Sequence, residues 1–375
     1  MKFARFLFLP ALMTAFVGSA FGQAPMADPA MSGMAPAQGA PAMLGADCYP
    51  PMYAGQMAPG PVYSDCPPCT GPDPFGQPCQ RTSRGYFSAD AFLVHRKGST
   101  PRTMASTAGV VQSSTADLDF GVETAPRLTF GYVLPNDVAI EGTAFYKDDL
   151  DALTDGVGAA NLVSPYFAAV SAAGGVLLAN SNYTGASEIH TDQSTGIHAY
   201  ELNLVETGRK FNFISGFRYT ELSDVLKVTA TEGAAVSQSQ VSTSNYLLGG
   251  QIGFRARHDW ELFGIEAGGK AGYMYNNAKS QMLVRDNNNT QVARYVQRSG
   301  NNDAFAGELS AKVTYRPLPY LAISGGYQCY WITELALSQD QLLDPVAQNA
   351  NSGLFLNAHG DMFYHGPSVG LEARW

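Results

Sequence analysis

Hydrophobic and polar residues alternate with a period of two in ten segments of the chain downstream of residue 84. In the segment 304–316, for example, Phe305 and Leu309 share one parity, whereas Glu308 and Lys312 share the other. This period is typical of β-strands whose two faces meet different surroundings. The ten segments are 85–94, 126–134, 138–146, 200–205, 211–220, 245–256, 263–275, 304–316, 321–331 and 368–375.

The connections between these segments alternate between short and long. The short ones carry turn sequences such as PND, ETGRK, RHDW and RPLP, and the long ones run for about 25 to 50 residues. Membrane β-barrels of the outer-membrane type have short turns at one end and long loops at the other, whereas a soluble sandwich is not expected to sort its connections in this way. The pattern therefore predicts an all-β fold, a closed antiparallel up-and-down transmembrane β-barrel of about ten strands. Two further strands, around VLLANSNYTG or LVRDNNNTQVARYVQ, would make it twelve.

The two parities of the predicted strands differ in polarity, so each should face a different environment. A bilayer requires every backbone N–H and C=O group to be paired, which a closed barrel achieves, and it places the apolar parity against lipid. The charged parity should then line the lumen. The predicted lumen-lining residues are Asp90, Arg127, Glu141, Glu201, Arg218, Arg255, Glu266, Lys270, Glu308, Lys312, Arg316, Glu372 and Arg374.

Strand number bears on what this lumen does. About eight strands leave room only for side chains, and about 16 are needed for a wide aqueous channel, so ten strands predict a narrow interior. The charges could form a selectivity lining for the porin-like passive passage of small solutes, which is the leading hypothesis. The alternative is a structural or adhesive barrel whose charges pair and plug the lumen.

The last strand has a distinctive ending. Val369, Leu371, Ala373 and Trp375 fall on the apolar parity, and the sequence ends on the aromatic residue. A terminal aromatic suits the interfacial girdle of a membrane barrel. It also resembles the C-terminal signal that the bacterial barrel-assembly machinery reads. The expected partners are therefore outer-membrane lipid and that machinery.

The N-terminal part has a different character. Lys2 and Arg5 precede a short apolar run and small residues, which predicts a secretory signal peptide over 1–22. Residues 23–82 are rich in Pro, Ala, Met and Cys and predict a flexible, disordered leader, followed by the barrel domain over 83–375. The leader contains four candidates for disulfides, Cys48, Cys66, Cys69 and Cys79, and either it or the loops could bind an envelope or extracellular partner.

Composition narrows the functional classes further. Hydrophobic residues make up 45% of the chain and charged residues 15%, with a formal net charge of -9. These values argue against a disordered chain, and the net charge argues against a nucleic-acid partner. The pattern G-x-S-x-G occurs at 366–370, but it runs into the last predicted strand and no strand-to-helix turn is predicted there, so we expect no enzyme activity, and the sequence predicts no cofactor and no metal site.

Several phrases resemble a known family. They are RLTFGYVLPNDVAIEGTAFY, AFAGELSAKVTYRPLPYLAISGGYQCYWITELALSQDQL and MFYHGPSVGLEARW, together with ADAFLVHR and SGFRYTEL. In these phrases the chain is similar to the beta-barrel porin family seven, a group of bacterial outer-membrane proteins. The resemblance covers roughly 85–375 and implies a barrel in the bacterial outer membrane, and it supplies no catalytic motif.

Overall fold

The computed structural model describes the barrel part of the chain and leaves its N-terminal part out. The described residues are 84–97, 101–134, 138–164, 169–171, 177–179, 183–206, 211–260, 262–286, 291–342 and 356–375. The predicted signal peptide, the leader and its four cysteines lie outside them. Among the described residues, no helix has the length and apolar character needed to cross a membrane.

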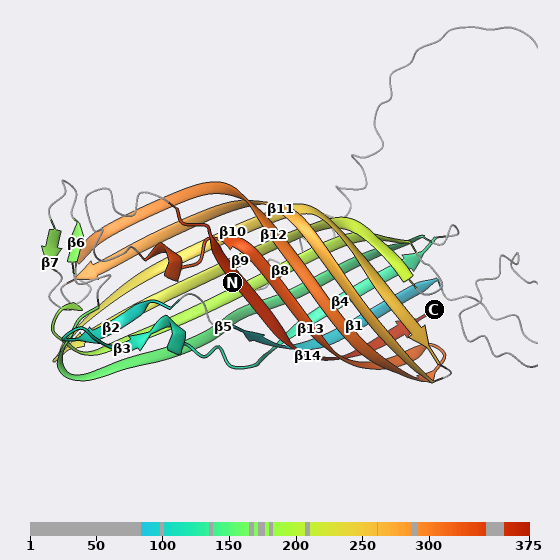
Figure 1. Cartoon of the computed structure of the whole chain (residues 1–375), viewed down its shortest axis with the longest axis horizontal. Helices are drawn as coiled ribbons and strands as arrows, with labels where there is room; N and C mark the ends of the chain where they lie inside the picture. The colour runs from blue at the N-terminus through green and yellow to red at the C-terminus, as the bar shows by residue number, and fades with distance from the viewer. Residues whose placement is uncertain are drawn as a thin grey trace, which may run out of the picture. The chain divides into compact units, whose positions relative to one another are not determined.

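Ten antiparallel strands form one closed barrel (Figure 1). Each barrel strand pairs with the barrel strands before and after it in the chain, and β1 also pairs with β14, which closes the ring. The predicted fold and strand number are thus confirmed. The barrel strands are β1 (Gly85–Arg96), β4 (Glu123–Val133), β5 (Val138–Leu162), β8 (Ala186–Glu206), β9 (Phe211–Glu232), β10 (Ala235–Asp259), β11 (Phe263–Asp286), β12 (Gln291–Leu318), β13 (Leu321–Leu335) and β14 (Gly360–Arg374).

The seam of the barrel runs between β1 and β14. The backbone N–H of Gly85 donates to the carbonyl of Trp375 at 2.9 Å, and the N–H of Trp375 donates back at 3.0 Å. Pairing continues up the seam to Arg96 and Tyr364. The last residues are therefore part of the ladder, which satisfies their backbone groups as a lipid environment requires.

In the described part of the chain, four short strands stay outside the barrel wall. Strands β2 (Thr103–Thr107) and β3 (Val110–Ser114) form one small sheet, and β6 (Ala169–Ser171) and β7 (Leu177–Ala179) form another. The alternative of twelve barrel strands is therefore not realised. Of its two candidate segments, one contributes β7, and the other forms the ends of β11 and β12.

The barrel strands are much longer than the sequence pattern indicates. Strands β9 and β10 contain 22 and 25 residues and are joined by a tight turn at Gly233, whose φ of +58° suits glycine. The connection expected there as a long loop is thus a β-hairpin. The upper part of β10, with the sequence VSQSQVSTS, has polar residues on both faces, so it lacks the amphipathic alternation that marks the lower part.

Outward-facing residues show where the bilayer ends. On β12 the large exposed residues Phe305, Leu309, Val313 and Tyr315 cover about ten positions, the length needed to cross the hydrocarbon at a tilt. Above Phe305, the next exposed positions of the same strand are polar, namely Asp303, Asn301, Ser299 and Gln297. We define the apolar stretch as the lipid-facing band, and the part of the barrel above it as the extension.

The extension contains only part of the barrel wall. Strands β5 and β8–β12 continue beyond the ends of β1, β4, β13 and β14 (Figure 1). Among the described residues, β12 pairs with β13 only as far as Ala306, and β4 pairs with β5 only as far as Phe145. The remaining strands form a curved sheet, and β2 and β3 contact β5 in the extension.

Candidate functional site: the filled lumen

Charged side chains from opposite walls meet in the middle of the lumen. Arg218 Nη2 contacts Glu201 and lies 2.7 Å from Glu308 Oε2. Lys270 Nζ lies 2.8 Å from Glu201 and 2.9 Å from Glu308, and Arg127 Nη1 lies 2.7 Å from Glu308. These five residues come from β9, β8, β12, β11 and β4, and we call them the central cluster.

The central cluster is shielded from water. The side chains of Arg218, Glu201 and Glu308 are only 2%, 5% and 8% exposed. Charges this deeply buried are tolerated only when ion pairs and hydrogen bonds replace their hydration. Gln251 supplies one such bond to Glu201 at 2.9 Å, and Gln328 accepts one from Arg127 at 2.8 Å. The cluster therefore joins the walls instead of leaving separately hydrated charges.

A second layer of ion pairs lies on the short-turn side of the central cluster. Arg255 of β10 contacts Glu141 of β5 at 3.1 Å, and Tyr86 of β1 donates to Glu141 at 2.7 Å. Glu266 lies 3.7 Å from Arg255 and 3.8 Å from Lys312. This layer also bridges strands that are not neighbours in the wall.

Near the short turns the paired charges are more exposed. Arg316 lies 2.5 Å from Asp259, which also pairs with Arg257 at 2.9 Å. Arg374 donates to Glu372 at 2.5 Å. The side chains of these residues are 10% to 31% exposed, so water reaches this end of the lumen more readily than the central cluster.

All the charged residues predicted to line the lumen lie on the inward parity of their strands. Most of them belong to the central cluster or to the second layer of ion pairs. Asp90 lies apart from them and accepts a hydrogen bond from Ser88 at 2.9 Å. Tyr86, Gln251 and Gln328 were not predicted as lumen-lining residues, because they are uncharged. Their inward parity was the only available signal.

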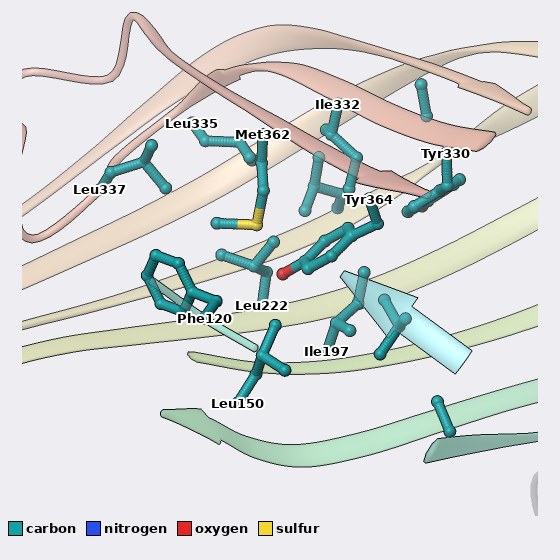
Figure 2. Close-up of a cluster of buried hydrophobic side chains, with 14 of the residues drawn as sticks. Phe120, Leu150, Ile197, Leu222, Tyr330, Ile332, Leu335, Leu337, Met362 and Tyr364 are labelled. Atoms are coloured by element: carbon teal, nitrogen blue, oxygen red, sulfur yellow. The ribbon is translucent and has the colours of Figure 1, made fainter. Parts of the chain in front are cut away.

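A continuous apolar layer crosses the lumen above the central cluster. Figure 2 shows its side chains pointing toward one another from different strands, with Met362 between Leu335 and Leu222. Each of the ten barrel strands contributes at least one buried residue, and the connections before β4 and after β13 add Phe120 and Leu337. This apolar layer was not predicted, because the inward parity of the strands was assigned to charged residues.

A buried polar network follows the apolar layer inside the extension. Arg96 Nη1 of β1 lies 2.9 Å from Asp224 Oδ1 of β9, and both side chains are at most 1% exposed. Asp224 also accepts hydrogen bonds from Gln193, Thr195 and Ser338. None of these residues was predicted, because they lie in the parts of the chain expected to be loops or, for Arg96, just beyond a predicted strand.

A second apolar cluster fills the extension beyond this network. Met104 of β2, Tyr183, Leu226 of β9 and Leu342 are all at most 3% exposed and belong to it. The lumen of the described part thus contains, in order from the short turns, the more exposed ion pairs, two charged layers, an apolar layer, a polar network and a further apolar cluster.

The predicted C-terminal motif lies on the outer wall. Val369, Leu371 and Trp375 are 64%, 54% and 60% exposed, and Ala373 is half-buried. They belong to the lipid-facing band beside β1 and β13. Their role as a signal for barrel assembly stays a prediction.

Cys329 is the free cysteine of the described part.

Comparison with known proteins gives a family and a set of similar folds. Residues 91–375 match the sequence model of a family described as "Putative beta barrel porin-7 (BBP7)". No curated protein matches the sequence. Among solved structures, the outer membrane protease OmpT from Escherichia coli is similar at 11% identity with a TM-score of 0.40, covering 78% of this chain and 97% of that chain. The toluene transporter TbuX from Ralstonia pickettii is similar at 9% identity with a TM-score of 0.29, covering 79% and 90%.

Proposed function

This chain belongs to the beta barrel porin-7 family, and on that premise we propose that it is a plugged barrel of the bacterial outer membrane with a structural or adhesive role. In this proposal the lumen conducts no solute, and binding takes place on the extension above the membrane. The predicted signal peptide and the lipid-facing band support the location.

One observation carries the proposal, namely the filling of the lumen. A pore lining would keep its charges separately hydrated, whereas Arg218, Lys270 and Arg127 are paired with two carboxylates and shielded from water. The apolar layer with contributions from all ten strands supports the same conclusion, because ions do not cross closely packed apolar side chains.

Planar-bilayer recording of the refolded protein tests this proposal. We expect no stable ohmic steps from the wild type. Two variants are recorded for comparison with the wild type. M362A/L222A removes side-chain volume from the apolar layer, and R218M removes the positive charge of Arg218 from the central cluster. Steady conductance by the wild type itself would contradict a plugged barrel.

The second candidate is porin-like passive passage of small solutes, which the description of the family favours. Here the central cluster would be the selectivity lining instead of a plug. This alternative predicts wild-type conductance whose preference between cations and anions changes when Arg218 is replaced by Met, since that replacement removes a positive charge from the lumen.

A further inference from the structure

The chain leaves β13 and folds into the barrel instead of continuing along the wall. We define the segment Glu334–Leu342, which begins with the last two residues of β13, as the strap. Glu334 has a φ of +59°, a left-handed conformation that is unfavourable for a residue with a side chain, and it marks the change of direction. Leu335 and Leu337 enter the apolar layer, and Leu342 enters the second apolar cluster.

Five polar side chains of the inner wall hold the strap. One comes from each of the strands β8 to β12, and together we call them the track: Gln193, Asp224, Asn245, Asn276 and Asn302. Four of them are completely buried. Hydrogen bonds join them into two groups, because Gln193 Nε2 donates to Asp224 and Asn276 Nδ2 donates to both Asn245 and Asn302.

The track binds mainly the backbone of the strap. The Asn245 side chain accepts from the N–H of Ala336 at 2.8 Å and donates to its carbonyl at 2.9 Å, as a neighbouring β-strand would. Asn302 donates to the Glu334 carbonyl at 2.7 Å. Asp224 accepts from the Ser338 N–H at 2.9 Å. Such contacts depend on an extended backbone more than on side-chain identity.

Two side-chain contacts add selectivity to this backbone recognition. The Ser338 hydroxyl donates to Asp224 at 2.5 Å, and Gln193 donates to Gln339 at 2.6 Å. On the other side of the strap, Leu335 and Leu337 are two positions apart and enter the same apolar layer. Alternating apolar anchors combined with backbone hydrogen bonds are the features by which proteins recognise extended peptides.

Because the track is polar, another peptide segment can take the place of the strap. Water can satisfy the amide and carboxylate groups of the track when the strap leaves, whereas a wholly apolar wall would be costly to expose. The track also lies on five of the strands that continue into the extension. The site is therefore on the part of the barrel that projects above the lipid-facing band.

We propose that the track is a docking site for an extended polypeptide segment of a partner, and that the strap occupies it as an internal ligand. The segment it takes carries two aliphatic residues at alternate positions followed by a hydroxyl-bearing residue. This proposal rests on the proposed adhesive role and names the binding site and the class of partner.

Peptide binding to the refolded protein in detergent tests this site. The probe is a fluorescein-labelled synthetic peptide with the sequence of residues 334–342, measured by fluorescence anisotropy. The release variant A336P/S338P lacks three strap donors and leaves the track intact. Because a docked strap reduces the fraction of competent sites, we expect this variant to bind the probe at least about 10-fold more tightly than the wild type.

A track variant and a scrambled peptide control for specificity. Adding Asn245→Leu to the release variant removes the two hydrogen bonds that Asn245 makes to the backbone. This change should return the affinity for the peptide to the wild-type value or below. Equal binding by the wild type and the release variant would overturn the proposal, as would tight binding that survives Asn245→Leu or that the scrambled peptide reproduces.

A second measurement uses the wild type and so does not depend on the folding of a variant. Saturating, isotope-labelled peptide should raise the hydrogen exchange of the protein's own Ala336 and Ser338 amides, because the strap leaves the track. If the hydrogen exchange of these two amides is unchanged when the peptide is bound, the strap has not been displaced and the proposal is contradicted. Peptide binding and bilayer conductance are independent readouts, so this proposal and the plugged barrel can fail separately.

Discussion

Arg96 of β1 and Asp224 of β9 form an ion pair across the lumen, with 2.9 Å between Nη1 and Oδ1. Their strands are four apart in one direction around the barrel and six apart in the other, so the pair ties nearly opposite walls together. Thr195 also contacts both residues. Since neither side chain reaches water, the charge of each depends on the other.

This pair should show strong energetic coupling. Arg96→Met leaves Asp224 buried without its cation, and we expect a loss of about 3 kcal/mol in the free energy of unfolding. The double variant R96M/D224N should lose less than the sum of the single variants, by about 1–3 kcal/mol. Denaturant titration in micelles measures all three variants, and additive losses would show that the contact is not a coupled pair.

Arg218 should matter more for stability than an exposed cation on the same strand. Arg218→Met leaves Glu201 and Glu308 with fewer partners in a buried site, so we expect a loss of about 3–5 kcal/mol. The matched control is Lys227→Met, because Lys227 is 42% exposed and lies 3.9 Å from Asp192. That exposed pair should contribute at most about 1 kcal/mol. Similar unfolding curves for the two variants would argue against a shielded cluster.

Met362 tests the packing of the apolar layer. It is 2% exposed among side chains from several strands, so Met362→Ala should leave a cavity and cost about 2–5 kcal/mol. Leu371→Ala on the same strand is the control, since Leu371 faces lipid that can fill the space. The comparison uses unfolding in lipid vesicles. A larger effect at Leu371 would reverse the assignment of inner and outer faces.

Leu309 and Gln297 test the upper limit of the lipid-facing band. Both are on β12, on the same outward parity, with Gln297 above Phe305. Leu309→Arg places a charge in the hydrocarbon and should cost about 2–4 kcal/mol, whereas Gln297→Arg should be nearly neutral. Folding into vesicles, followed by denaturant titration, gives both values. A comparable cost at Gln297 would mean that the bilayer extends higher than we infer.

Gly307 tests a close contact on the outer wall. A Cβ atom there would lie 1.9 Å from Cζ2 of Trp331, its partner across the strands, so Gly307→Ala must displace the ring. We expect a loss of about 1–3 kcal/mol. Gly325→Ala is the control, because its Cβ would meet only the Ser368 carbonyl at 4.0 Å. The fluorescence of Trp331 should shift in the first variant alone.

Parts of the interior were predictable and parts were not. Glu201, Arg218 and Glu308 could be assigned to the inner face, because alternation fixes which residues share a face of a strand. Their pairing could not be predicted, since it depends on barrel girth and on the stagger between strands. Asp224 was missed altogether, because it lies in a part of the chain that was expected to be a loop.

The sequence by itself determined that this protein is a membrane β-barrel and which face of each crossing segment meets lipid. The physical reason is that hydrocarbon requires paired backbone groups and an apolar outer face, and both requirements leave a period of two along the chain. The tertiary structure alone decided that the lumen is filled and that the strap lies on its polar track. These features depend on residues that are distant in sequence and meet only after the barrel has closed.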